Sequence, residues 1–96
     1  MMENELIIIR DFCLQWKIDQ SFIDSLEEYG LIEVTIINDE QYIYSSQLKD
    51  LERYTRFYYE LSINMEGIDV IRHLLDQIDT LQQENLHLKN QLRLLF

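Results

Sequence analysis

The chain has 96 residues, of which 18 are acidic and 8 are basic, giving a formal net charge of −10. This length holds one small domain plus an appendage, and the acidic balance repels phosphate backbones and favours basic partners. No apolar run reaches the length of a membrane span, and the N-terminus lacks the basic-then-apolar layout of a signal peptide. The lone Cys13 excludes a disulfide framework, so we expect a cytoplasmic protein with no membrane partner.

The N-terminal third of the chain predicts a small strand and two short helices. Residues 6–9 are rich in isoleucine and suit a strand, and residues 10–17 place apolar side chains four apart on one helical face. Asp19 is a candidate N-cap for the second helix, and Gly30 ends that helix at the position where glycine is favoured. The expected buried face of this helix consists of Phe22, Ile23, Leu26 and Tyr29. Two short helices separated by a tight turn are the pattern of a helix-turn-helix.

The segment after Gly30 changes from a helical period to an alternating one, which is typical of a strand. We expect Ile32, Val34 and Ile36 on one side of this strand, with Glu33 and Thr35 on the other. Residues 38–41 form a predicted turn and residues 42–44 a returning strand. The pattern therefore predicts a β-hairpin, or wing.

A third helix and a long final helix complete the predicted order. Ser45 or Ser46 is placed to cap the third helix, which continues to about Leu61. Its expected inner face consists of Leu48, Leu51, Tyr54, Tyr58 and Leu61. Asn64 is placed to cap the final helix.

The final helix carries the heptad repeat of a coiled coil. Ile71, Ile78, Asn85 and Leu92 occupy the a positions, and Leu74, Leu81, Leu88 and Leu95 occupy the d positions. We call these eight residues the seam. An Asn at position a lowers stability but rejects registers that leave its amide unpaired. The seam predicts a partner helix, which we expect to come from a homodimer; the alternative is that it packs on the N-terminal half of its own chain.

The residue types that most often act in catalysis are not arranged for it in this sequence. His73 and His87 lie fourteen residues apart, too far to share one metal within a chain, and Cys13 lies between apolar residues without cationic neighbours. We find no phosphate-binding glycine loop, nucleophile elbow, zinc-ligand spacing or paired-acid motif. We therefore expect a protein that is not an enzyme and has no metal or cofactor.

A winged helix-turn-helix followed by a coil is the layout of the MerR-type regulators, which dimerise through that coil. Residues 12–32 resemble the start of those proteins, including the Glu-Tyr-Gly-Leu-Ile stretch at 28–32. We expect a mainly α fold: a MerR-like winged helix-turn-helix module over residues 1–63 with a short β-hairpin wing, and a long C-terminal coiled-coil helix over residues 64–96.

The second helix lacks the charge that DNA binding requires. In MerR-type regulators it carries basic residues that face DNA, but residues 19–30 here contain four acids and no Lys or Arg. Residues 1–65 hold thirteen acidic and five basic residues, which removes the electrostatic source of non-specific affinity for DNA. We therefore expect no nucleic-acid partner. The alternative is a MerR-type transcription factor that uses Arg53, Arg56 and the wing on DNA.

Protein recognition fits the charges better. The second helix presents Asp24, Glu27 and Glu28 outward, next to Gln20 and Ser21; we call these three acids the acidic ridge. Such a ridge steers and orients a basic partner, while apolar contacts supply affinity. The candidates for those apolar contacts are Ile37, Tyr42 or Tyr44 on the hairpin and Phe57 or Tyr59 on the third helix. The alternative for an exposed ring on the third helix is that it covers the base of the coil.

The whole chain resembles the CbpM chaperone modulators, MerR-like proteins that bind and inhibit the J-domain co-chaperone CbpA. Two short shared features are Phe-Cys-Leu at 12–14 and Gly-Leu-Ile at 30–32. The stretch 56–68 is similar to the family's Arg-Leu-x-x-Glu-Leu-x-x-x-x-x-Gly-Ile pattern. Residues 81–85 resemble the Leu-x-x-Glu-Asn of the family's coil. This chain has Met65-Glu66 where family members can carry Trp-Pro, and residues 15–17 also differ from the family's turn. The resemblance implies that this protein inhibits a CbpA-like J-domain co-chaperone by covering the basic face that the J-domain offers to its chaperone.

Overall fold

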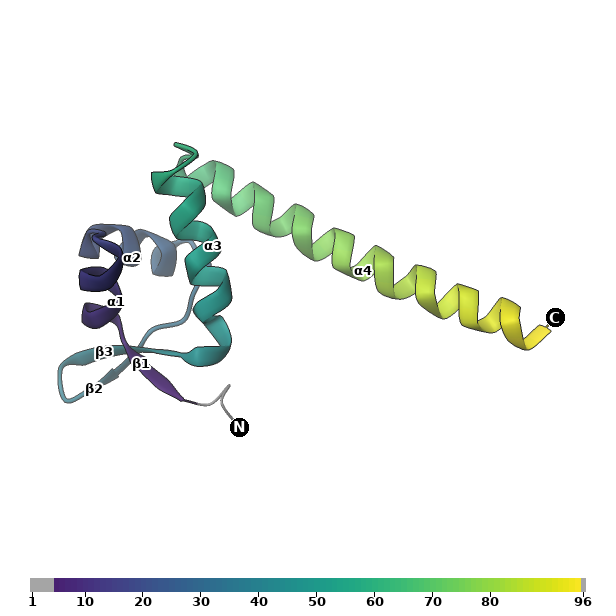
Figure 1. Cartoon of the computed structure of the whole chain (residues 1–96), viewed down its shortest axis with the longest axis horizontal. Coiled ribbons are helices and arrows are strands. Elements are labelled where there is room, and N and C mark those ends of the chain that lie inside the picture. The colour runs from purple at the N-terminus through teal and green to yellow at the C-terminus, as the bar shows by residue number, and fades with distance from the viewer. Residues whose placement is uncertain (1–4, 96) are drawn as a thin grey trace.

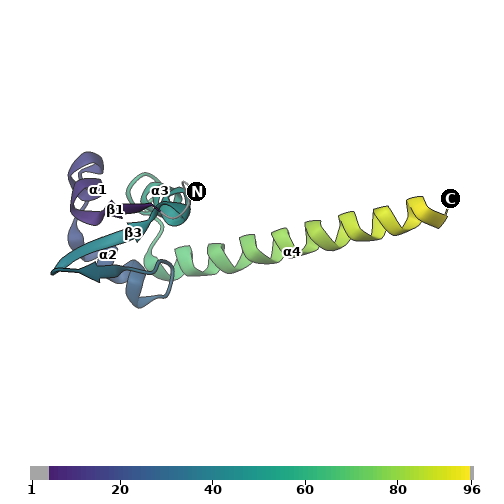
Figure 2. The ribbon, with the colours of Figure 1, turned by 90° about the horizontal axis from the view of Figure 1, so that it is seen from below.

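A computed structural model describes residues 5–95 as helices around a three-stranded antiparallel sheet, with one helix projecting from this head as a rod (Figures 1 and 2). The elements in chain order are β1 (Leu6–Ile8), α1 (Ile9–Trp16), α2 (Gln20–Glu28), β2 (Thr35–Ile37), β3 (Glu40–Tyr44), α3 (Leu48–Tyr59) and α4 (Met65–Leu95). A single 3-10 turn over Ser45–Gln47 leads into α3. The predicted fold class is confirmed.

The sheet has the strand order β1-β3-β2, so β3 lies in the middle and the hairpin β2–β3 forms the wing. Asn38 and Asp39 connect the two wing strands with φ values of 51° and 65°. Two successive left-handed residues match the right-handed twist of the flanking strands, and Asn and Asp tolerate that conformation.

The first wing strand is shorter than the alternating pattern predicts. It begins at Thr35. Before it, the side chain of Gln47 satisfies the backbone of Glu33 in place of a neighbouring strand. The Glu33 N–H donates to Gln47 Oε1 at 2.8 Å, and Gln47 Nε2 donates to the Glu33 carbonyl at 3.1 Å. Ile32 is buried and Val34 packs on the core, but Ile36 is 64% exposed. The partner of Ile36, Gln41, shares a face of β3 with the buried Ile43, so the alternation predicts the side of Ile36 correctly although its side chain is not buried.

The end of α2 follows the predicted glycine signal. Gly30 has φ of 72°, its N–H donates to the Glu27 carbonyl at 2.9 Å, and the Leu31 N–H donates to the Leu26 carbonyl at 2.9 Å. This pair of bonds is a Schellman motif, which satisfies carbonyls at the helix end and folds Leu31 back onto Leu26 in the core. At the other end, Asp19 occupies the N-cap position, but its side chain makes no capping hydrogen bond.

The core lies between the helices and one face of the sheet. Its fully buried side chains are Ile9, Ile23, Leu26, Ile43, Leu51 and Ile68. Two residues predicted on the inner face of α3 do not belong to it. One is Leu61, because α3 ends at Tyr59 and the chain turns at Ser62, which has φ of 57°. Leu61 therefore lies in the turn and is 62% exposed, while Tyr58 is half-exposed and Phe57 packs on the core instead.

The long helix α4 contacts the head only through its first turns. Asn64 caps it as predicted, since Asn64 Oδ1 accepts a hydrogen bond from the Gly67 N–H at 2.8 Å. Met65 and Ile68 are buried against the head, whereas every residue from Asp76 to Leu95 is exposed along the rod that Figures 1 and 2 show. The alternative that the seam packs on its own N-terminal half is therefore overturned.

Candidate protein-binding surface

The acidic ridge lies on the outer face of α2. Phe22, Ile23 and Leu26 turn into the core, and at 100° per residue the opposite face belongs to positions 21, 24 and 28. Asp24, Glu27 and Glu28 are all exposed, as predicted from their spacing. The helix contains no basic residue, so its outer surface carries three negative charges without a compensating cation of its own.

Gln20 ties the acidic ridge to the wing. Its Nε2 donates to Gln41 Oε1 on β3 at 2.7 Å and to Asp24 Oδ1 at 3.1 Å. Ile36 pairs with Gln41 in the hairpin register, so these two side chains share the face of the wing that looks toward α2. The exposed Ile36 is therefore an apolar neighbour of the acidic ridge. The alternating pattern gives only the side of the strand on which Ile36 lies, so sequence reasoning did not identify it as a contact residue.

The other candidate residues of the wing lie on the opposite face. Along β3 the side chains alternate, so Tyr42 and Tyr44 point away from Gln41, and Ile37 joins them through its pairing with Glu40. Ile37 and Tyr44 are exposed and Tyr42 is half-buried. These three residues are not brought together with the acidic ridge.

The aromatic residues of α3 form a cluster against α2. The ring of Phe22 lies 4.9 Å from that of Tyr58 and 5.3 Å from that of Tyr59, and the two tyrosine rings are 5.0 Å apart. Both tyrosines are about two-fifths exposed. Phe57, the other predicted contact, is partly buried against the core, so the exposed aromatic surface beside α2 comes from Tyr59 and from Tyr58, which sequence reasoning had assigned to the core.

Carboxylates on α2 and at its N-cap also act on Cys13. Partial burial raises the pKa of the Cys13 thiol, and the negative charges of Asp24 and Asp19 raise it further. A raised pKa keeps the sulfur protonated and weakly nucleophilic. The arrangement agrees with the prediction that Cys13 is a packing residue.

The seam on α4 faces solvent. Leu74, Ile78, Leu81, Leu88, Leu92 and Leu95 are each at least half-exposed, Asn85 is also exposed, and Ile71 is partly covered near the head. Six large apolar side chains on one stripe of a helix favour a covering partner. The structure of a single chain leaves that partner, and hence the homodimer, as a prediction.

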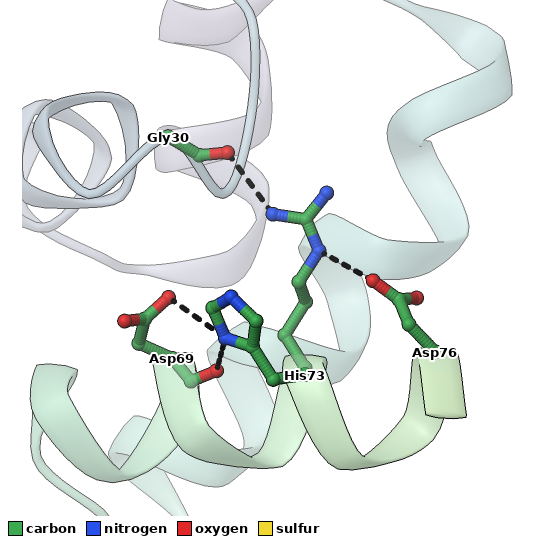
Figure 3. Close-up of polar contacts among 5 residues, drawn as sticks. Gly30, Asp69, His73 and Asp76 are labelled. Atoms are coloured by element: carbon green, nitrogen blue, oxygen red, sulfur yellow. Dashed lines mark hydrogen bonds and ion pairs between the residues drawn. The ribbon is translucent and has the colours of Figure 1, made fainter. Parts of the chain in front are cut away.

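The head is attached to a different face of α4 from the seam. Met65, Ile68 and Arg72 share one face by their three- and four-residue spacing. Figure 3 shows the polar contacts on this face. Arg72 Nη1 donates to the Gly30 carbonyl at 3.2 Å, and Arg72 Nε lies 3.2 Å from Asp76 Oδ2. Next to it, His73 Nδ1 lies 2.8 Å from the Asp69 carbonyl oxygen. At 100° per residue this face lies roughly 150° from the seam, so a second helix can approach the seam without meeting the head.

The described residues form neither a metal site nor a membrane-spanning helix. Among residues 5–95, no group of three or more His, Cys, Asp or Glu side chains is arranged to hold a metal ion. Within the same part of the chain, no helix combines the length and apolar character needed to cross a membrane.

The fold and the exposed helix surfaces define a helix-turn-helix protein of the MerR class. The family described as MerR HTH family regulatory protein matches residues 7–90. The chain belongs to this family.

Curated relatives narrow the similarity further. Proteins named chaperone modulatory protein CbpM from Pseudomonas entomophila and Pseudomonas putida are 24% and 26% identical to this chain over 95 residues, which covers 95% of this chain and 94% of each relative. The protein of the same name from Escherichia coli is 28% identical over 85 residues, covering 88% of this chain and 84% of the relative. The resemblance to the CbpM proteins is thus confirmed over nearly the whole chain. No solved structure matches it.

Proposed function

We propose that this protein is a non-catalytic modulator that binds the J-domain of a CbpA-like co-chaperone and inhibits it by masking its chaperone-binding face. The observation that carries the proposal is the acidic ridge on α2, the helix that MerR-type regulators use to contact DNA. Three exposed carboxylates and no cation on this helix suit a basic protein surface and oppose a phosphate backbone. The names of the curated relatives support the same class of partner.

The apolar part of the proposed interface flanks the acidic ridge on both sides. Ile36 lies on the side of the wing, and Tyr59, whose ring packs against Phe22 and Tyr58, lies on the side of α3. Aromatic and branched side chains at the centre of an interface supply most of its affinity, while charges set orientation and association rate. Inhibition is then steric competition and requires no chemistry by this chain.

We further propose that the protein is a homodimer through the seam. The head sits on another face of α4, so covering the seam leaves the acidic ridge of each copy open. The exposed Asn85 at an a position fits a specific helix partner, because an amide in the seam disfavours alternative registers.

The test of the J-domain proposal is calorimetric titration of this protein into the J-domain of a CbpA-like co-chaperone from the same organism, at low and high salt. Wild type should bind, and the affinity should fall as salt rises, because exposed charges are screened. The variant Asp24→Lys/Glu27→Lys/Glu28→Lys should bind much more weakly and lose this salt dependence.

The matched control is Asp11→Lys/Glu33→Lys/Asp50→Lys, which makes the same change in net charge at exposed positions outside α2. If this control weakens binding as much as the ridge variant does, net charge and not the acidic ridge governs the interaction. If wild type gives no heat at either salt, the J-domain proposal fails, and genomic DNA fragments become the next ligand to titrate.

A further inference from the structure

A hollow of about 260 Å³ lies between the α1–α2 turn and α3, beside the N-terminal end of α2. Its walls include Trp16, Lys17, Arg56, Tyr59 and Glu60. Here, in an acidic protein, a lysine and an arginine from separate elements line one space. Neither the helix-turn-helix pattern nor the acidic ridge requires these two cations.

The two cations of the hollow have no partner of their own. Among residues 5–95, Arg10 pairs with Glu40 and Arg72 pairs with Asp76, whereas the side chains of Lys17 and Arg56 make no hydrogen bond or ion pair. Glu60 directly follows α3, one turn from Arg56, and also lines the hollow without forming an ion pair with Arg56. The positive charge is therefore available to a ligand.

The hollow is held in shape by the backbone around it. Lys17 ends α1 in the left-handed conformation, with φ of 55°, and the next residue, Ile18, is buried and donates its N–H to the Cys13 carbonyl at 3.0 Å. Tyr59 Oη accepts a hydrogen bond from the Asp19 N–H at 3.2 Å, which fixes the ring as a wall. Because the oxygen accepts in that bond, the hydroxyl hydrogen is free to donate to a ligand.

This set of groups fits a carboxylate. A guanidinium offers a planar fork of donors that matches a carboxylate, and an ammonium adds a point charge. The aromatic walls, Trp16 and Tyr59, suit the methylene groups that precede the carboxylate of an acidic side chain. Glu60 reduces the net charge of the lining to about one positive unit, which matches one carboxylate better than a phosphate dianion.

We propose that this hollow receives the carboxylate of an Asp or Glu side chain from the protein that docks on the acidic ridge. The proposal rests on the proposed function, since it assigns a second contact to the same partner. The hollow adjoins the N-terminal end of α2, the helix that carries the acidic ridge, so the two surfaces present opposite charges on neighbouring parts of the head. A partner must then offer a basic face with an acid next to it, and this pairing fixes its orientation.

The hollow can be tested directly because Trp16 is the only tryptophan of the chain. We would follow the fluorescence of Trp16 and the NMR resonance of its Nε1–H while adding a blocked Ala-Glu-Ala peptide. The peptide is added up to about 50 mM, because a single charge-assisted contact gives a dissociation constant of millimolar order. A saturable change is expected with this peptide and not with blocked Ala-Gln-Ala. No saturable change, or an equal change with both peptides, would overturn the proposal.

Two double variants locate the effect. Lys17→Asn/Arg56→Gln should abolish the response; Asn is chosen because it tolerates the left-handed backbone at this position. Lys49→Gln/Arg53→Gln removes the same charge from exposed positions of α3 outside the hollow and should respond as wild type does. An unchanged response in the first variant would overturn the assignment. Inorganic phosphate that binds more tightly than the Glu peptide would show a site for free anions and overturn it as well.

The J-domain titration separates this proposal from the one on which it rests. If wild type binds the J-domain, Lys17→Asn/Arg56→Gln should weaken binding about five- to tenfold, the size expected for a partly exposed charge pair, and the α3 control should not. If wild type does not bind the J-domain, the proposed function fails, while the peptide titration still decides whether the hollow binds a carboxylate.

Discussion

Arg72 of α4 donates a hydrogen bond to the carbonyl oxygen of Gly30, at the end of α2, over a distance of 3.2 Å. This bond links the rod to the helix that carries the acidic ridge. The carbonyl lies just beyond the end of α2, where the helix dipole is negative, so a guanidinium is favoured there. The same side chain reaches Asp76 on its own helix, which holds the guanidinium in place.

Replacing Arg72 should loosen the rod from the head. Arg72→Met keeps much of the apolar stem but removes the donor, and we expect the free energy of unfolding to fall by about 1 kcal/mol, since a charged donor is lost from a partly exposed site. Urea denaturation measures this. Arg93→Met, at the far end of α4, is the control and should change stability little. Equal effects of the two substitutions would contradict a structural role for the bond to Gly30.

Gly67 should not tolerate the alanine that most helix positions favour. Alanine is usually better than glycine inside a helix by about 1 kcal/mol. Here a Cβ would lie 2.7 Å from Ile63 Cγ2 and 3.1 Å from Asn64 Oδ1, the capping oxygen of α4. Because Ile63 packs on the core, we expect Gly67→Ala to lower the melting temperature, with a net loss of about 1 kcal/mol.

The control for Gly67 is Gln77→Ala, which lies further along the same helix and should be neutral. A raised melting temperature for Gly67→Ala would show that Ile63 moves aside at little cost. It would also remove the steric reason for glycine in the Gly-Ile part of the motif that resembles the CbpM family.

The sequence was most informative where the signal was local. The Gly30 end of α2 and the Asn64 cap of α4 depend on residues within one turn, and both form as predicted. The acidic ridge also follows from helical spacing alone. Tyr58 and Leu61 were misassigned because their surroundings depend on more than helical spacing: Tyr58 packs beside Phe22 of α2, and the turn at Ser62 ends α3 before Leu61.

The composite surfaces could not be predicted for the same reason. Gln20 meets Gln41 across 21 residues, and no periodicity reports such a contact. Lys17 and Arg56 come together only when the α1–α2 turn packs beside α3. Charge counting showed that the head is acidic, but it could not show that two of its few cations share one hollow.

The seam should control self-association, and two leucines of equal exposure test it. Leu88 and Leu86 are each 58% exposed in the single chain, but Leu88 lies in the seam and Leu86 lies two residues away on another face. Leu88→Asp places a charge in the predicted helix interface and should yield a monomer, whereas Leu86→Asp should leave the dimer intact. Sedimentation velocity over a range of concentrations measures both. A monomeric wild type, or equal dissociation by both variants, would contradict the homodimer.

The reactivity of Cys13 should report the charge of the acidic ridge. Burial and the carboxylates of Asp24 and Asp19 all raise the pKa of the thiol, so Asp24→Asn should bring that pKa closer to its ordinary value. The thiolate fraction at pH 8 then rises, and alkylation by iodoacetamide should be faster than in wild type, although still slower than for a free thiol because burial remains. Glu28→Gln removes the same charge from the same helix, but Glu28 is not among the groups that raise the Cys13 pKa. Equal alkylation rates for Asp24→Asn and Glu28→Gln would show that the charge of Asp24 has no specific effect on the pKa of the Cys13 thiol.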